Sequence, residues 1–165
     1  DFALQLSVIC VGYLLFQDWP SPSSLLWLPP ALAALVLTAF GVGLILAAIN
    51  VYVRDVAFLV DVGLQVGFWL APILYSYGQV VKGAVEFGLA PDLVSRLYML
   101  NPMANVVIGF QRALWPAATS QTSSTVAFPG QLDVRLALCL LGSLVLVWFG
   151  MRIFVKLSSN FGQEF

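Results

Sequence analysis

The chain has 165 residues, of which 61% are apolar and only 9% are charged, whereas soluble domains contain roughly 45–50% apolar and about 25% charged residues. This composition indicates a membrane protein, and the net charge of -1 excludes the basic surface that a nucleic-acid partner requires. The sequence contains no His, which excludes imidazole catalysis, His metal sites and Ser-His-Asp chemistry.

Four apolar stretches are long enough, or nearly so, to cross a membrane, because about 20 residues rising ~1.5 Å each span roughly 30 Å of hydrocarbon. They cover residues 2–16, 25–49, 57–75 and 136–154. No positively charged region precedes Phe2, so the first stretch does not resemble a signal peptide. We therefore expect an all-α integral membrane protein with about four transmembrane helices. We expect residues 1–165 to form one transmembrane domain of an N-terminally truncated chain.

Two polar connections join the first three stretches. Residues 17–24 contain prolines that break a helix, and the neighbouring Trp19 and Trp27 suit a membrane interface. Residues 50–56 form so short a connection that Arg54 and Asp55 must lie at the water boundary.

The segment after the third stretch changes character. Residues 76–93 are rich in Gly, and the pairs Lys82/Glu86 and Asp92/Arg96 have the four-residue spacing of ion pairs on a helix. This pattern predicts a short amphipathic helix at the membrane interface. The polar tract at 118–125 is predicted to be a loop.

A second short helix is predicted between these two segments. Asn101 is a suitable N-cap and Pro102 a suitable first residue for a helix that continues to Trp115. About 14 residues are too few to cross a bilayer, so we expect this helix to re-enter on its own side. Arg112 in this helix could line a polar route or bind neighbouring carbonyl groups.

The number of crossings places the two ends of the second half of the chain on one side. The third stretch crosses from that side to the opposite side. The re-entrant helix enters and leaves the membrane on the opposite side, and the last stretch crosses back. Arg54 therefore shares its side with Arg152 and Lys156. The opposite side carries four basic residues, Lys82, Arg96, Arg112 and Arg135. We take the first two to be neutralised and the third to be buried, although basic residues alone do not decide the orientation.

Small residues spaced four apart occur in two stretches. Gly63 and Gly67 form a GxxxG pattern, and Gly43 and Ala47 repeat the small-xxx-small spacing. We expect these residues to pack helices closely within one subunit, with an interface between subunits as the alternative.

The residues offer no recognisable enzyme chemistry. The phosphate-binding loop, the nucleophile elbow and the common metal-binding patterns are all missing from the sequence. We therefore expect no catalytic or metal-binding residue and no bound cofactor, and the chain by itself cannot hydrolyse ATP. Asp55 and Asp61 would lie on opposite faces of one helix and make a poor catalytic pair. Asp61 is interpreted as an interfacial charge, or as facing a partner or a water-filled space.

Aromatic residues gather at the end of the third stretch, opposite the Arg54 side. Phe68, Trp69, Tyr75 and Tyr77 could form an ordinary aromatic belt at the lipid headgroups. Alternatively, they could line a conduit and stack on sugar rings.

The order and spacing of several short strings are similar to those of one known family. They are NVYVRDV at 50–56, LAPILY at 70–75, NPM at 101–103 followed by Arg112, and FGQEF at 161–165. Together they resemble the permease subunits of type 2 ABC exporters. The branch that exports lipid-linked O-antigen, capsular polysaccharide or teichoic acid is the most similar. The resemblance covers the whole chain, as the last four of the family's six membrane spans.

The resemblance implies a multi-pass protein of the cytoplasmic (inner) membrane that forms a homodimer and docks a separate ABC ATPase subunit. It implies that Arg54 and Asp55 lie in the cytoplasmic turn near that ATPase. It also implies that Asn101, Pro102 and Arg112 lie at an extracytoplasmic gate. The aromatic residues would then line the path of the lipid-linked polysaccharide.

Three other functions remain open. A drug or small-lipid exporter from the same superfamily would have the same architecture. A polyprenyl-phosphate-dependent membrane enzyme would need clustered acidic residues, whereas those of this chain are scattered. A scaffold without transport would leave a broken re-entrant helix unexplained.

Overall fold

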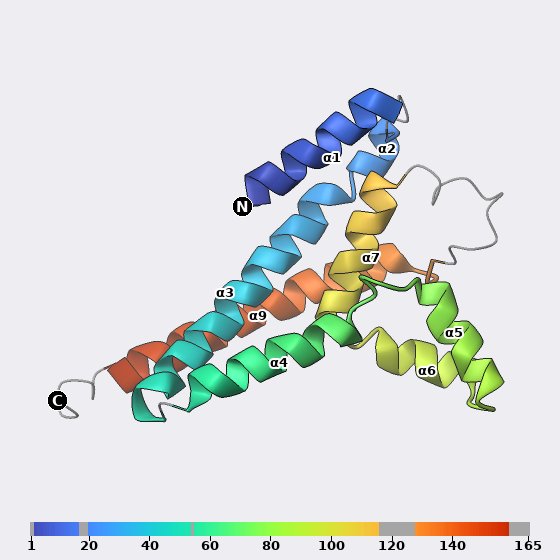
Figure 1. The fold of residues 1–165 in the computed structure, drawn as a ribbon. Coiled ribbons are helices and arrows are strands. Elements are labelled where there is room, and N and C mark those ends of the chain that lie inside the picture. The colour runs from blue at the N-terminus through green and yellow to red at the C-terminus, as the bar shows by residue number, and fades with distance from the viewer. Residues whose placement is uncertain (1, 17–19, 54, 116–127, 159–165) are drawn as a thin grey trace.

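The computed structural model describes residues 2–16, 20–53, 55–115 and 128–158, and every regular element within these ranges is a helix (Figure 1). The apolar helix α1, Phe2–Phe16, has the predicted bounds. Two segments of the described chain, Pro22–Tyr52 and Leu132–Ser158, are long and apolar enough to cross a membrane. The first contains the short α2, Pro22–Leu25, and the long α3, Leu28–Tyr52. The second is α9.

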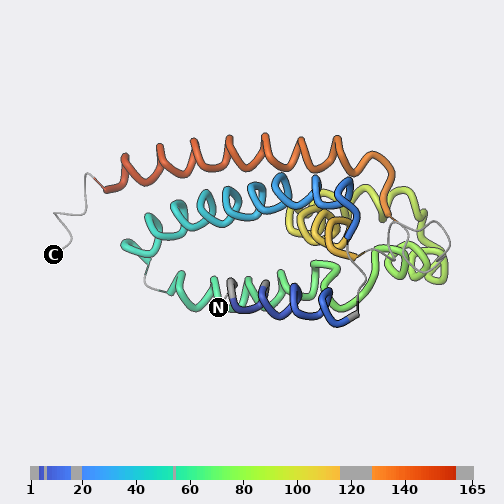
Figure 2. Tube along the Cα trace, turned by 90° about the horizontal axis from the view of Figure 1, so that it is seen from above, coloured from blue at the N-terminus to red at the C-terminus, as the bar shows by residue number. Residues whose placement is uncertain are grey.

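The helices α3 and α9 pack side by side and run in the same direction, as Figures 1 and 2 both show. At their C-terminal ends the Tyr52 hydroxyl donates a hydrogen bond of 3.1 Å to the carbonyl oxygen of Leu157. The turn after α3 and the end of α9 therefore lie at one end of the molecule, as the predicted topology requires, while the membrane crossings themselves stay a prediction. Arg54 itself and the 161–165 string lie outside the described residues.

Small residues allow the backbones of α3 and α9 to approach closely. A Cβ atom added to Gly150 would lie 2.8 Å from the carbonyl oxygen of Gly41. By contrast, nothing lies within 4 Å of a Cβ added to Gly43, Gly63 or Gly67. The expectation that these three glycines pack helices within one subunit is therefore wrong for the described chain, and an interface between subunits stays open.

A buried hydrogen bond also joins these two helices. The Ser143 hydroxyl donates to the carbonyl oxygen of Cys139 at 2.6 Å, which uses its one proton. The Thr38 hydroxyl, 2.9 Å from the Ser143 oxygen, must therefore be the donor between the helices.

The third expected span is shorter than its apolar stretch. Helix α4, Val56–Leu70, stops before the stretch ends. Pro72 has no N–H and disfavours helical backbone at the residue before it. Fifteen helical residues rise about 22 Å, so α4 alone is shorter than a bilayer core.

Two helices occupy the region where one amphipathic helix was predicted. These are α5, Tyr77–Glu86, and α6, Pro91–Tyr98. Gly88, with a φ of 68°, turns the chain between them. This left-handed conformation favours glycine because it has no Cβ.

Helix α7, Pro102–Leu114, packs against α3 and crosses the start of α9 (Figure 1). Its Ile108 is fully buried in a hydrophobic core with Tyr77, Met99 and Leu132. This hydrophobic core of the described chain therefore lies at the end of the molecule where α9 begins.

Candidate functional site

Helix α7 begins as the sequence predicts and holds the chain that follows α4. The Asn101 side chain accepts a hydrogen bond of 3.0 Å from the Met103 N–H, and Pro102 is the first helical residue. The Asn101 amide also donates to the carbonyl oxygen of Leu70 at 3.3 Å. One turn from the end of α7, Gln111 donates to the carbonyl oxygen of Pro72 at 2.7 Å.

Arg112 is held by aromatic rings. Its guanidinium carbon lies 4.3 Å from the centre of the Trp27 ring and 6.0 Å from that of Phe128. This cation–π geometry joins the end of α7 to the turn between α2 and α3. The structure thus places Arg112 in an aromatic clamp, which neither sequence interpretation had anticipated.

The four predicted conduit aromatics fall into two groups. The Phe68 and Trp69 rings meet edge to face with centroids 6.0 Å apart, and the residues are 41% and 60% exposed. Tyr77 is instead buried, and its hydroxyl shares a hydrogen bond with Ser95 on α6. Tyr75 donates to the carbonyl oxygen of Trp69 at 2.8 Å.

Tyr98 extends this tyrosine network. Its hydroxyl donates to the Tyr75 hydroxyl at 3.2 Å. Burial, followed by the hydrogen bond to Tyr75, raises the pKa of Tyr98 far above its usual range. The two tyrosine hydroxyls therefore form a chain of hydrogen bonds from the end of α6 to the carbonyl oxygen of Trp69 on α4.

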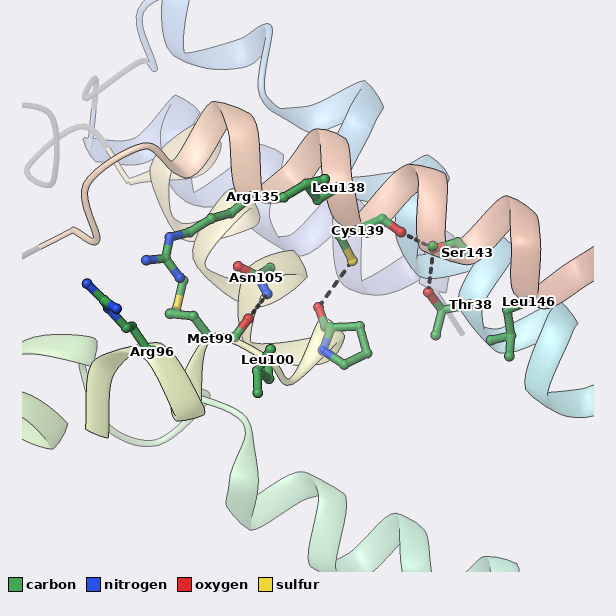
Figure 3. Close-up of a pocket in the computed structure, with 12 residues that line it drawn as sticks. Thr38, Arg96, Met99, Leu100, Asn105, Arg135, Leu138, Cys139, Ser143 and Leu146 are labelled. Atoms are coloured by element: carbon green, nitrogen blue, oxygen red, sulfur yellow. Dashed lines mark hydrogen bonds between the residues drawn. The ribbon is translucent and has the colours of Figure 1, made fainter. Parts of the chain in front are cut away.

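A pocket of about 440 Å³ opens between α6, α7, α9 and α3, and sequence reasoning did not find it. Figure 3 shows Arg96 from α6 and Arg135 from α9 extending to the same end of this pocket. No Asp or Glu is among the residues that line it, and the ion pair of Arg96 with Asp92 stays a prediction. The sequence holds no signal for the pocket, because Arg96 and Arg135 lie far apart along the chain.

Asn105 forms the floor of this pocket. Its side chain is buried, and its amide nitrogen donates to the carbonyl oxygens of Met99 at 2.8 Å and Asn101 at 3.0 Å. Its Oδ1 atom is buried and has no hydrogen-bond partner. A buried acceptor without a donor is uncommon, so Asn105 is an exception among the buried polar side chains of the described residues.

The remaining predicted site residue that the structure describes lies far from the pocket. Asp55 precedes α4, at the end of the molecule where Tyr52 meets Leu157. Asp61 and Gln65 line a shallow depression along α4 with Leu64 and Phe68. Within the described ranges, His, Cys, Asp and Glu form no group of three that could hold a metal ion.

Two curated proteins are similar to almost the whole chain. Both are named O-antigen export system permease protein RfbA and come from Klebsiella pneumoniae. One is 23% identical over 163 residues and the other 21% identical over 162 residues, in each case 98% of this chain. The chain is a distant homologue of O-antigen export permeases.

This homology to O-antigen export permeases agrees with the resemblance seen in the short sequence strings. The chain spans about half the length of these relatives, 54% in both cases. No family model and no solved structure matches the chain. The homology and the two long apolar helices together indicate a membrane protein.

Proposed function

We propose that this chain is the transmembrane permease subunit of an ATP-driven ABC exporter of lipid-linked polysaccharide, such as O-antigen, capsule or teichoic acid. The observation that carries the proposal is the similarity to O-antigen export permeases over 98% of the chain. ATP hydrolysis would belong to a separate subunit, whose binding of ATP would shift the permease between closed and open packings. An efflux permease for drugs or small lipids is the alternative within the same superfamily.

The proposed topology has four crossings of the cytoplasmic membrane, by α1, α3, α4 and α9. Helix α4 crosses together with residues 71–76, which follow it in non-helical conformation. Irregular backbone is tolerated at membrane depth only where its polar groups are satisfied. The carbonyl groups of Leu70 and Pro72 meet this condition, because Asn101 and Gln111 of the α7 region donate to them.

Exposed apolar surface supports the crossing of α4 and α9. Phe58 and Leu64 on α4, and Leu138 and Val145 on α9, are large apolar residues that remain exposed. Water would make such a continuous surface unfavourable, whereas lipid tails or a second permease subunit would cover it. The open Gly63 and Gly67 lie on this same α4, which supports the proposed homodimer.

The two ends of the molecule would have different roles. The Asp55 end would face the cytoplasm and the ATPase subunit, together with Arg54. At the other end, α7 with Asn101, Pro102 and Arg112 would form part of the gate. Phe68 and Trp69 are the exposed aromatics that could stack on sugar rings, while Tyr75 and Tyr77 would hold the α5–α6 pair in place.

Disruption of the gene in its native host, with complementation, tests this function. We expect polysaccharide to disappear from the cell surface and to accumulate inside, while efflux of hydrophobic dyes stays unchanged. Affinity purification of the complementing protein in mild detergent should recover a stoichiometric nucleotide-binding subunit. Normal surface polysaccharide with impaired dye efflux would favour the drug exporter, and reproducible absence of the ATPase would contradict both transport functions.

A further inference from the structure

Helix α4 carries a single charge within a long apolar stretch. Residues 56–81, which contain all of α4 and the non-helical segment after it, include Asp61 and no other charged residue. Asp61 lies six residues beyond Asp55, a rise of about 9 Å, and its side chain is exposed. If α4 crosses the membrane as proposed, a carboxylate at this depth is costly against lipid, so it faces a protein partner or water.

Two hollows in the surface meet at Asp61. A hollow of about 310 Å³ between α3 and α4 is lined by residues that include Asn50 of α3 and Asp61 of α4. The depression of about 490 Å³ along α4 is lined by Asp61, Leu64, Gln65 and Phe68. Residues 61, 65 and 68 have the spacing of one face of a helix. We call Asp61, Gln65 and Phe68 the polar face of α4.

The side chains of this polar face suit the chemistry of a sugar. The Asp61 carboxylate accepts hydrogen bonds, as from hydroxyl groups, and the Gln65 amide both donates and accepts them. Phe68 is 41% exposed, and its ring meets the Trp69 ring edge to face. The flat face of an aromatic ring is apolar enough to pack on the C–H face of a sugar ring. A polyhydroxylated ligand therefore matches the polar face better than an apolar one does.

The sign of the charge on the polar face distinguishes between saccharides. None of the described residues that line the two hollows is Lys or Arg. An acidic sugar or a phosphodiester at this face would meet the like charge of Asp61, and the two would repel each other more strongly than in bulk water. The two-fold symmetry of a homodimer would supply a second Asp61 in the equivalent position. An uncharged sugar instead donates its hydroxyl protons to the same carboxylate.

We propose that Asp61, Gln65 and Phe68 line the path of the saccharide, and that the charge of Asp61 restricts export to polysaccharides without acidic groups. Asp61 accepts hydrogen bonds from the hydroxyls of a passing sugar, Gln65 donates to its oxygen atoms, and Phe68 packs on its C–H face. The inference rests on the proposed export function and narrows its substrate class. Uncharged O-antigen or capsule fits the polar face, whereas the phosphodiester chain of teichoic acid does not.

Export of two matched polymers tests the selectivity. The full-length permease and its ATPase subunit would be expressed in two reporter strains that lack their own polysaccharide exporter. One strain makes a lipid-linked polymer of uncharged sugars, and the other makes the same polymer with one uronic acid in each repeat. We expect about tenfold more of the uncharged polymer at the cell surface, the ratio for one unfavourable contact between like charges.

The outcome separates this inference from the export function on which it rests. Equal export of the two polymers would overturn the inference and leave the export function intact. Export of neither polymer, with normal surface polysaccharide after disruption of the gene in the native host, would contradict both.

The variant D61N removes the charge and keeps the shape of the side chain and one acceptor oxygen. We expect D61N to raise export of the acidic polymer about tenfold and to change export of the uncharged polymer little. The matched control D92N removes a carboxylate from the first turn of α6, outside both hollows, and should leave the ratio of the two polymers unchanged. If Asp61 instead paired with a basic residue of the assembly, D61N would lower export of both polymers equally, which would contradict the proposal.

Labelling tests for water at the polar face without any substrate. Positions 65 and 66 lie at neighbouring depths on α4 but about 100° apart around the helix. All other cysteines of the full-length chain would be replaced, and Q65C and V66C would be treated with a water-soluble maleimide. We expect Q65C to react about tenfold faster, because the reactive thiolate forms in water and not against lipid or a packed subunit. Equal rates would overturn the proposal, whatever the ratio of the two exported polymers.

Discussion

At the scale of single residues, the contact between α3 and α9 depends on the absence of two side chains. A Cβ on Gly150 would meet the Gly41 carbonyl oxygen at 2.8 Å, and one on Gly41 would meet the Leu146 side chain at 2.9 Å. Backbone atoms cannot move aside as a flexible side chain can, so a methyl group at position 150 must separate the helices. The separation would also lengthen the buried hydrogen bond between Thr38 and Ser143.

We expect G150A to destabilise the protein by about 1–3 kcal/mol, the usual range for overpacking a buried contact. The matched control is G83A on α5, where nothing lies within 4 Å of the added Cβ and alanine is the better helix former. Thermal unfolding in detergent should show a clear loss for G150A and no loss for G83A. Similar unfolding temperatures for the two variants would contradict the close approach of α3 and α9.

At the scale of elements, α7 combines a local start signal with long-range anchors. Asn101 caps its own helix through the Met103 N–H and holds the Leu70 carbonyl at the end of α4. N101A removes both bonds. We expect the loss of the cap alone to lower the free energy of unfolding by about 0.5–2 kcal/mol. N101D keeps an acceptor for the cap but cannot donate to Leu70, so its unfolding temperature should lie between those of N101A and the unmodified protein. If N101D proved as stable as the unmodified protein, the Leu70 bond would have no energetic role.

The sequence predicts an element well where one residue type decides its end. The Asn101-Pro102 pair marks the start of α7. Pro72 ends α4 early because proline breaks a helix even inside an apolar run. A prediction from the length of the apolar run alone therefore made this helix too long. The division into α5 and α6 depends on Gly88 with its positive φ, a conformation that composition alone does not reveal.

The contacts between elements were less predictable. The expected glycines on α4 are open, and Gly41 and Gly150 form the contact instead, because the rotation of a helix decides which small residues face its neighbour. The pocket joins Arg96, Asn105 and Arg135 from three helices. No spacing along the chain brings these residues together, so only the packed structure shows the site.

At the scale of the whole molecule, the parallel course of α3 and α9 gives a test of the proposed topology. Asp55 and Ser158 lie at the end where Tyr52 binds Leu157, whereas Lys82 lies on α5 beyond the end of α4. If α4 and α9 each cross the membrane once and α7 does not, positions 55 and 158 share one side and position 82 lies on the other. The bounds of the helices therefore fix which sites a membrane-impermeant reagent can reach together.

Single cysteines introduced by D55C, S158C and K82C, in a background in which Cys10 and Cys139 are replaced, measure this arrangement. In sealed vesicles of one orientation, a membrane-impermeant maleimide should label D55C and S158C together and K82C only from the opposite face. Labelling of D55C and S158C from opposite faces would mean that α7 completes a crossing. The 15 helical residues of α4 rise only about 22 Å, so residues 71–76 must supply the remaining thickness of the bilayer. Labelling of all three cysteines from one face would mean that they do not, and that α4 with residues 71–76 does not span the membrane.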